Sequence, residues 1–217
     1  MPFSPANFTR NAAIVAAAIT TAALAGRYAY SGLFPNLIPK NFGTVVEGSL
    51  YRSGELTPTA TRLVAERHDI KTIIDLGAHE PGSSEEHRAQ ATADALGLTR
   101  IVFDLEGDAT GDPNSYVDTL RLVQDPANQP VLVHCAAGAQ RTGCFVMLYR
   151  HLIEGVPAND AMSEATNYRH DPSDTPEVPA MFLEYKDAVR ARLNDPSLPP
   201  IPYDGEAAQR AKLGTGD

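Results

Sequence analysis

The sequence predicts a single α/β domain in which helices cover both faces of a mainly parallel sheet. Apolar segments at residues 71–76, 100–105 and 130–134 read as buried strands, and each is followed by a segment with helical signals. Strands that alternate with helices usually pair in parallel, because each helix carries the chain back to the same end of the sheet. The 217 residues, 43% of them hydrophobic and 21% charged, suit one globular domain with additional ends.

The first 26 residues differ from the rest of the chain. Arg10 is their only charged residue, and the alanine-rich apolar run behind it ends on Ala23-Leu24-Ala25. This pattern is typical of a secretory signal, while the aromatic residues that follow it favour an uncleaved anchor at a bilayer interface. We expect residues 1–26 to be a signal peptide or membrane anchor that places the domain outside the cytoplasm. The alternative is an alanine-rich helix on a cytoplasmic protein.

A linker over residues 27–42 and a folded domain over residues 43–194 follow. Short strands at residues 45–46 and 50–51 flank a turn at Glu47-Gly48. Thr57 before Pro58 predicts the start of a helix that reaches residue 68, and the strand at residues 71–76 comes next.

Helix-start signals also mark the second half of the domain. Acidic residues in the first turn predict a helix over residues 84–97, and Asp112 before Pro113 predicts a capped helix that reaches residue 123. Further helices are expected at residues 141–154, 157–168 and 176–193. The proline-containing tail, residues 195–217, is expected to be disordered or loosely packed.

The strand at residues 130–134 leads into a loop of small residues and then into a helix. Backbone N–H groups of such a loop can turn inward and bind an anion at the helix N-terminus. Cys135 starts this loop and faces its positive end, which favours the nucleophilic thiolate at neutral pH. Arg141 offers a planar fork that suits two phosphate oxygens at once. Thr142 offers a hydroxyl that can bond the sulfur as it leaves, and His134 is expected to orient the loop.

The sequence His134-Cys135-x5-Arg141-Thr142-Gly143 resembles the signature of the cysteine-based protein tyrosine phosphatases. The chain is similar to the compact dual-specificity branch, in particular to atypical plant and fungal enzymes and their bacterial relatives. The resemblance covers about residues 42–170 and includes residues 50–54, 73–76 and 125–130. It implies a sheet of four or five strands, a cysteinyl-phosphate intermediate and no cofactor or metal. It also implies a phosphate-binding loop made by Ala136, Ala137, Gly138, Ala139, Gln140 and Arg141.

The resemblance also places a general acid on the loop after the strand that ends near Leu105. Asp108 follows a glycine in a stretch that reads as mobile, so it is the first candidate. Asp104 is the second, because its spacing to Cys135 is close to that usual in the family. Glu106 is the third, and Asp112 is better explained as a helix cap.

Several functions compete for this loop. The main reading is a protein tyrosine or dual-specificity phosphatase, with a phosphorylated protein or a small phosphoester as substrate. Inositol phosphates or phosphoinositides are the alternative substrates, although Ala136, Ala137, Ala139 and Gln140 supply no extra positive charge. A phospho-binding pseudophosphatase would need a broken catalytic residue, and none is evident. A rhodanese-like sulfurtransferase would not be expected to carry Arg141-Thr142-Gly143.

Composition and the remaining polar residues set further limits. The net charge of −9, with no block of Lys and Arg, argues against nucleic acid as a partner. Cys144, the second of two cysteines, reads as a packed side chain, or else as a redox partner of Cys135. Arg52 either borders the active site or makes a structural ion pair, with the ion pair favoured. Asp75 either braces the loop or caps a helix.

Overall fold

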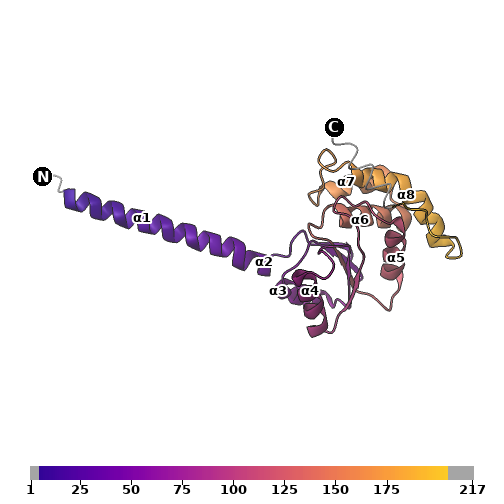
Figure 1. Cartoon of the computed structure of the whole chain (residues 1–217), viewed down its shortest axis with the longest axis horizontal. Coiled ribbons are helices and arrows are strands. Elements are labelled where there is room, and N and C mark those ends of the chain that lie inside the picture. Colours follow the sequence, from indigo (N-terminus) through magenta and orange to yellow (C-terminus); the bar gives the residue numbers. More distant parts are fainter. Residues whose placement is uncertain (1–4, 205–217) are drawn as a thin grey trace. The chain divides into compact units, whose positions relative to one another are not determined.

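The computed structural model describes residues 5–204, with side chains from residue 15 onward. The chain divides into two compact units, Met1–Ile38 and Pro39–Asp217. The first unit is helical: α1 spans Pro5–Tyr28, a π-helical turn η1 spans Ala29–Leu33, and α2 spans Phe34–Leu37 (Figure 1). Much of the segment that the sequence predicts as a linker is therefore helical, and Pro39 begins the second unit.

The prediction of a membrane-anchored or exported chain is wrong. Within residues 5–204, no helix combines the length and the apolar character that are needed to cross a membrane. Helix α1 has 24 residues, but most of its apolar side chains are alanines, interrupted by asparagine, threonine and arginine. Alanine carries little apolar surface, so a run of alanines lacks the transfer free energy that a run of leucines would supply.

The second unit contains a sheet in the order β1-β2-β5-β3-β4. The strands are β1 (Gly43–Val46), β2 (Leu50–Ser53), β3 (Thr72–Asp75), β4 (Thr99–Val102) and β5 (Val131–His134). Only β1 pairs antiparallel within this sheet, and the other four strands are parallel. The predicted α/β fold with a mainly parallel sheet is confirmed, and five strands match the implied number.

The helices divide between the two faces of this sheet. Helices α3 (Pro58–His68) and α4 (Ser84–Ala95) lie on one face, and α5 (Pro113–Gln124), α6 (Gln140–Leu152), α7 (Ala158–Thr166) and α8 (Glu177–Asn194) lie on the other (Figure 1). The alternation of β5 follows this division. Val131 and Val133 belong to the larger core with α5–α8, whereas Leu132 belongs to the smaller core with α3. The central strand is thus buried on both sides, which explains its continuous apolar sequence.

Part of the predicted disordered tail is packed against α5. Ile201 is buried, its N–H donates to Asn114 Oδ1 at 2.9 Å, and its carbonyl accepts from Asn114 Nδ2 at 3.0 Å. One asparagine side chain therefore satisfies both backbone groups of Ile201, which fixes the segment without regular secondary structure. Residues 205–217 of the predicted tail lie outside the described residues.

Candidate active site

Cys135 lies at the carboxyl end of β5, where the chain turns into α6. Its side chain is buried, and its sulfur accepts a hydrogen bond from the Gly138 N–H, with 3.2 Å between N and Sγ. Gly138 has φ +72°, and a Cβ there would lie 2.5 Å from the Gly54 nitrogen, so only glycine fits. Residues 135–141, here called the phosphate loop, therefore curl around the sulfur and direct at least one backbone donor at it.

Arg141 lies in the first turn of α6 and is buried. Its Nη1 donates to the carbonyl oxygens of Leu76 at 3.3 Å, of Leu105 at 3.2 Å, and of Gly77. These acceptors belong to the segments that follow β3 and β4, at the same edge of the sheet as Cys135. The guanidinium is thus held by three carbonyl dipoles beside the phosphate loop. Its Nε is buried without a hydrogen-bond partner among the described residues.

Thr142 follows Arg141 and is also buried. Its hydroxyl has no hydrogen-bond partner within residues 5–204, so the expected bond to the Cys135 sulfur is not made in this structure. A buried hydroxyl without a partner costs free energy. It is therefore available to a group that enters the site or to a sulfur that shifts during reaction.

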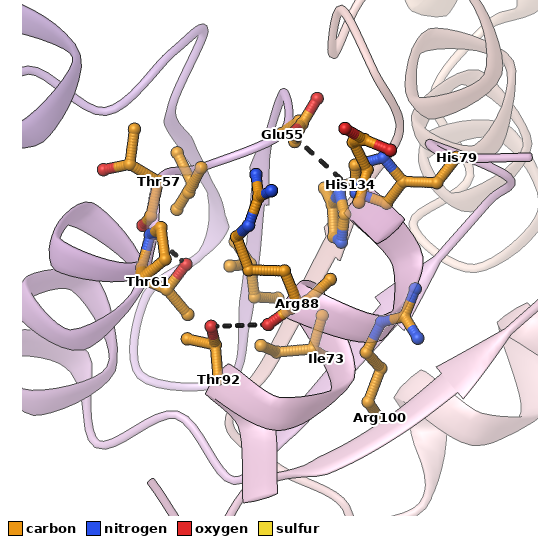
Figure 2. A pocket seen from close by; sticks show the side chains of 14 residues that line it. Glu55, Thr57, Thr61, Ile73, His79, Arg88, Thr92, Arg100 and His134 are labelled. Atoms are coloured by element: carbon orange, nitrogen blue, oxygen red, sulfur yellow. Dashed lines mark hydrogen bonds and ion pairs between the residues drawn. The ribbon is translucent and has the colours of Figure 1, made fainter. Parts of the chain in front are cut away.

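His134 belongs to the opposite face of the sheet from α6. It borders a cavity of about 150 Å³ between the sheet and helices α3 and α4, which none of residues 135–141 lines (Figure 2). Its Nε2 lies 3.7 Å from Asp75 Oδ2, and the same Asp75 oxygen pairs with Arg100 Nη2 at 2.7 Å. Burial lowers the pKa of His134, although the Asp75 carboxylate and the backbone of Cys135 raise it. His134 is therefore neutral at pH 7, and the orienting role expected of it stays a prediction.

Asp75 is fully buried and both of its oxygens are engaged. Oδ1 accepts from the Ala78 N–H at 2.7 Å, and Oδ2 pairs with Arg100. Burial raises the pKa of Asp75, but His134, the Ala78 N–H and Arg100 together outweigh it and lower the pKa. Asp75 therefore braces the turn after β3, and through it the Leu76 and Gly77 carbonyls that hold Arg141.

The candidate general acids lie on the segment between β4 and α5. Asp104 and Glu106 are exposed, and Asp104 lies beyond the end of β4 rather than within a strand. Asp108 is half-buried, and its Oδ1 accepts from the Thr110 N–H at 3.0 Å and the Thr110 hydroxyl at 2.6 Å. Asp112 caps α5 by accepting from the Asn114 N–H at 2.9 Å, as its sequence position predicts.

Cys144 is buried on α6. Burial raises its pKa to about 12, against a smaller lowering by a hydrogen bond with Tyr116. The thiol is therefore protonated at neutral pH, which agrees with a packed side chain. No group of three or more His, Cys, Asp or Glu side chains in the described part of the chain could hold a metal ion.

Sequence reasoning missed much of what surrounds the phosphate loop. Lys40 and Asn41, expected in a linker, donate to its carbonyl oxygens, and Tyr168 stacks on Arg52 beneath it. The two contacts from Lys40 and Asn41 join residues about one hundred positions apart, so no local sequence pattern predicts them. The positive φ of +50° at Asn41 is a structural signal that the sequence alone does not show.

Comparison with known proteins supports the resemblance. The family model described as "Tyrosine phosphatase family" matches residues 36–187. The tyrosine-protein phosphatase-like protein OCA2 of Saccharomyces cerevisiae is 33% identical over 119 residues, covering 54% of this chain and 59% of that protein. The inositol diphosphatase SIW14 of the same yeast is 33% identical over 122 residues, covering 52% of this chain and 40% of SIW14. The matches therefore span about half the length of these curated relatives.

Solved structures share the fold. The catalytic core of SIW14 superposes with a TM-score of 0.57 at 25% identity, over 75% of this chain and 96% of that core. TpbA of P. aeruginosa superposes with a TM-score of 0.58 at 21% identity, over 72% of this chain and 92% of that structure. At that identity, the TpbA match bears on the fold alone.

Proposed function

The chain belongs to the tyrosine phosphatase family, and from this premise we propose that it hydrolyses phosphate esters through a covalent intermediate on Cys135. The observation that carries the proposal is the buried Cys135 sulfur, which accepts the Gly138 N–H inside a loop that ends on the buried Arg141. A thiolate at the N-terminus of α6 meets the positive end of the helix dipole. The same loop then offers its donors to a phosphoryl group.

In the first step, the Cys135 thiolate attacks phosphorus and forms an S–P bond while the P–O bond to the leaving group breaks. A carboxylic acid gives its proton to the leaving oxygen. The leaving group of a phosphoprotein then departs as an alcohol or phenol, and that of an inositol diphosphate as a protonated phosphate monoester. Asp108 is our first candidate for this acid, Asp104 the second and Glu106 the third. Arg141 and the loop N–H groups stabilise the charge on the non-bridging oxygens.

In the second step, water attacks phosphorus and the S–P bond breaks. The carboxylate formed in the first step accepts a proton from the water, and inorganic phosphate leaves with Cys135 as the thiolate again. The partnerless Thr142 hydroxyl lies next to Arg141 in the chain and suits a hydrogen bond to the departing sulfur. Neither step changes an oxidation state.

Phosphotyrosine-type protein substrates are the first candidate substrate class. The loop positions Ala136, Ala137, Ala139 and Gln140 carry no charge, so Arg141 is the only cationic side chain within residues 135–141. One cation and the backbone donors match one terminal phosphate monoester. The single Arg141 cation of the loop suits a substrate with one phosphoryl group better than a substrate with several neighbouring phosphates.

Inositol diphosphates are the second candidate. Four relatives, among them SIW14 and DSP3 of Arabidopsis thaliana, carry the name inositol diphosphatase, and DSP3 is 32% identical over 113 residues. Lys40 favours the same class, since its exposed Nζ donates to the Ala136 carbonyl at 2.8 Å. Lys40 therefore places a second cation at the rim of the loop, and this amine is able to contact a second phosphate of the substrate.

Parallel assays distinguish the two classes. Phosphate release from phosphotyrosyl and phosphoseryl peptides and from inositol diphosphates would be measured on wild-type and Lys40→Met protein. If the first candidate holds, kcat/KM is highest for phosphotyrosyl peptides, and Lys40→Met changes kcat/KM by the same factor for peptides and for inositol diphosphates. If inositol diphosphates are preferred and Lys40→Met raises their KM, the second candidate replaces the first. Absence of phosphate release from every ester would contradict the proposed reaction.

A further inference from the structure

The outer side of the phosphate loop is held by donors from the start of the second unit. The Ala136 carbonyl accepts from Lys40 Nζ at 2.8 Å and from the Glu55 N–H at 3.1 Å. The Gly138 carbonyl accepts from Asn41 Nδ2 at 2.9 Å and, in a short contact, from Arg52 Nη2. The outward-facing carbonyls of the loop are thus tied to three side chains and one backbone group.

These bonds fix the direction of the opposite backbone groups. In a planar trans peptide, the carbonyl of one residue and the N–H of the next point in opposite directions. Outward carbonyls at Ala136 and Gly138 therefore turn the N–H groups of Ala137 and Ala139 inward. The Gly138 N–H, which donates to the Cys135 sulfur at 3.2 Å, shows the inward direction directly.

Arg52 differs from the other donors because it is charged and completely buried, with 0% of its surface exposed. No carboxylate lies within 4.0 Å of its guanidinium among residues 5–204, so the ion pair that the sequence favoured is absent. The nearby Glu164 instead pairs with Arg150 at 2.9 Å. The Arg52 Nε and Nη1 have no hydrogen-bond partner in the part of the chain that the structure describes.

The surroundings of Arg52 offer dipoles and an aromatic face rather than an anion. Its guanidinium carbon lies 3.7 Å from the centroid of the Tyr168 ring, an arrangement typical of cation–π stacking. The Tyr168 carbonyl accepts from Asn41 Nδ2 at 2.8 Å, so the amide that holds Gly138 also holds the segment carrying this ring. The ring packs over Gly43, where a Cβ would lie 2.4 Å from the Tyr168 hydroxyl.

The place of Arg52 in the sheet brings its charge close to the nucleophile. Arg52 of β2 pairs with Val133 of β5, and Val133 precedes Cys135 by two residues in the chain. Burial lowers the pKa of Arg52 to about 10, while the anionic forms of Tyr168 and Cys135 and the Glu164 carboxylate raise it and Arg150 lowers it. Arg52 is therefore still a cation at neutral pH. A buried cation without an ion-pair partner is costly, and a thiolate nearby would offset part of this cost.

We propose that Arg52 is a positioning residue for the proposed reaction, which holds the phosphate loop through the Gly138 carbonyl and, as a buried cation, stabilises the Cys135 thiolate. Asn41 shares the first role and carries no charge. The inference rests on the proposed function, because a thiolate nucleophile is what gives the buried charge its use. It assigns to β2 an electrostatic contribution separate from that of Arg141 and the N-terminus of α6.

The test measures the rate of Cys135 alkylation by iodoacetamide against pH in the full chain, with the modified residue mapped by mass spectrometry. Arg52→Gln removes the charge and keeps a donor for the Gly138 carbonyl, whereas Arg52→Lys keeps the charge. We expect Arg52→Gln to move the midpoint of the pH profile upward by about one unit, and Arg52→Lys to leave it near that of the wild type. Arg121→Gln, which removes an arginine of α5 that lies 3.5 Å from Asp118, is the matched control and should not move the midpoint.

Equal midpoints for Arg52→Gln, Arg52→Lys and wild type, in proteins with native circular dichroism, would overturn the electrostatic role. If Arg52→Gln fails to fold, Arg52→Met replaces it as the neutral variant. Asn41→Ala tests the holding role without a change of charge, and we expect weaker binding of vanadate with an unchanged midpoint. Unchanged vanadate affinity would overturn that role. The alkylation profile needs no turnover. A chain that shows the shift but releases no phosphate would therefore contradict the proposed function and leave standing only the electrostatic effect of Arg52 on Cys135.

Discussion

At the scale of single residues, the proposed reaction depends on a few side chains at one edge of the sheet. In this proposal Cys135 supplies the sulfur, Arg141 the fixed positive charge, and one carboxyl group of the segment before α5 the proton. Buried carbonyl acceptors from Leu76, Gly77 and Leu105 hold Arg141 before any substrate arrives. A group held in this way needs little reorganisation during the reaction, which is how enzymes stabilise developing charge efficiently.

The general acid can be identified by comparing single variants. We expect Asp108→Asn to slow turnover of a substrate with a poor leaving group by about 10²–10⁴-fold, because the leaving oxygen would depart unprotonated. The loss should shrink for p-nitrophenyl phosphate, whose leaving group needs no proton. Initial rates on both substrates check this. If Asp104→Asn or Glu106→Gln shows this pattern instead, the acid is that residue.

Asp112→Ala serves as the control for these variants. It removes the α5 cap and should lower the free energy of unfolding by about 1 kcal/mol while leaving the rate on the poor leaving group nearly unchanged.

Arg141→Lys tests whether the planar fork matters beyond its charge. We expect kcat/KM to fall by about 10²-fold or more, because an ammonium cannot contact two phosphoryl oxygens and three backbone carbonyls in one geometry. Steady-state kinetics and vanadate binding measure the loss of rate and of affinity. Wild-type activity with lysine at this position would contradict the role given to the guanidinium.

At the scale of elements, a buried ion pair between β3 and β4 stabilises the turn that follows β3. Asp75 is buried between Arg100 at 2.7 Å and the Ala78 N–H at 2.7 Å. Its carboxylate fixes the turn whose Leu76 and Gly77 carbonyls hold Arg141. The pair therefore connects the strand pairing of β3 and β4 with the geometry of the active site.

Asp75 also predicts how stability depends on pH. Because its pKa is lowered in the folded state, the carboxylate stabilises the fold above the ordinary aspartate pKa of about 3.9, and this stabilisation is lost as the pH falls through the lowered value. Asp75→Asn should lower the free energy of unfolding at pH 7 by about 3 kcal/mol, since Arg100 stays buried without its partner. Urea titrations at pH 7 and at a series of pH values below about 3.9 check both statements. An Asp75→Asn protein as stable as the wild type at pH 7 would contradict the bracing role.

The helices and strands around the site were predictable where local sequence signals determine their positions. The apolar residues 130–134 with the glycine-containing loop after them predicted β5, the turn and α6, and Asp112-Pro113 predicted the start of α5. The predicted strand at residues 100–105 proved shorter, since β4 ends at Val102 and the Leu105 carbonyl turns to Arg141. That end is set by a partner far along the chain, which periodicity does not reveal.

At the scale of the whole molecule, the alternation of strands and helices predicted the fold class correctly. The amino-terminal pattern, in contrast, led to the wrong prediction of an anchored or exported chain. An alanine-rich run shares its small and apolar composition with export signals, but no helix within residues 5–204 is both long enough and apolar enough to span a membrane. The contacts of Lys40 and Asn41 were not predicted for a different reason. Both residues precede β1 and bond loop residues about one hundred positions later, and no motif around them marks those contacts. Arg52, which the sequence placed either beside the active site or in an ion pair, bonds the loop at the Gly138 carbonyl.

The division into two units predicts that the first is dispensable for catalysis. Every side-chain contact to the phosphate loop described above comes from Lys40 or later residues, and the family match begins at residue 36. A fragment of residues 36–217 should therefore retain kcat within about two-fold and a cooperative thermal transition. Kinetics and calorimetry on the fragment and the full chain measure this. A fragment that folds but has lost most of its rate would show that residues 1–35 contribute to the site.

In the proposed reaction, turnover passes through a phosphoryl group on Cys135. Acid quenching of the full chain during turnover of a ³²P-labelled phosphotyrosyl peptide or inositol diphosphate, followed by mapping of the label, tests this intermediate. We predict label on the peptide that contains Cys135, more of it in the general-acid variant when the leaving group is good, and none in Cys135→Ser. Turnover with the label on another residue, or label and turnover that persist in Cys135→Ser, would contradict the account.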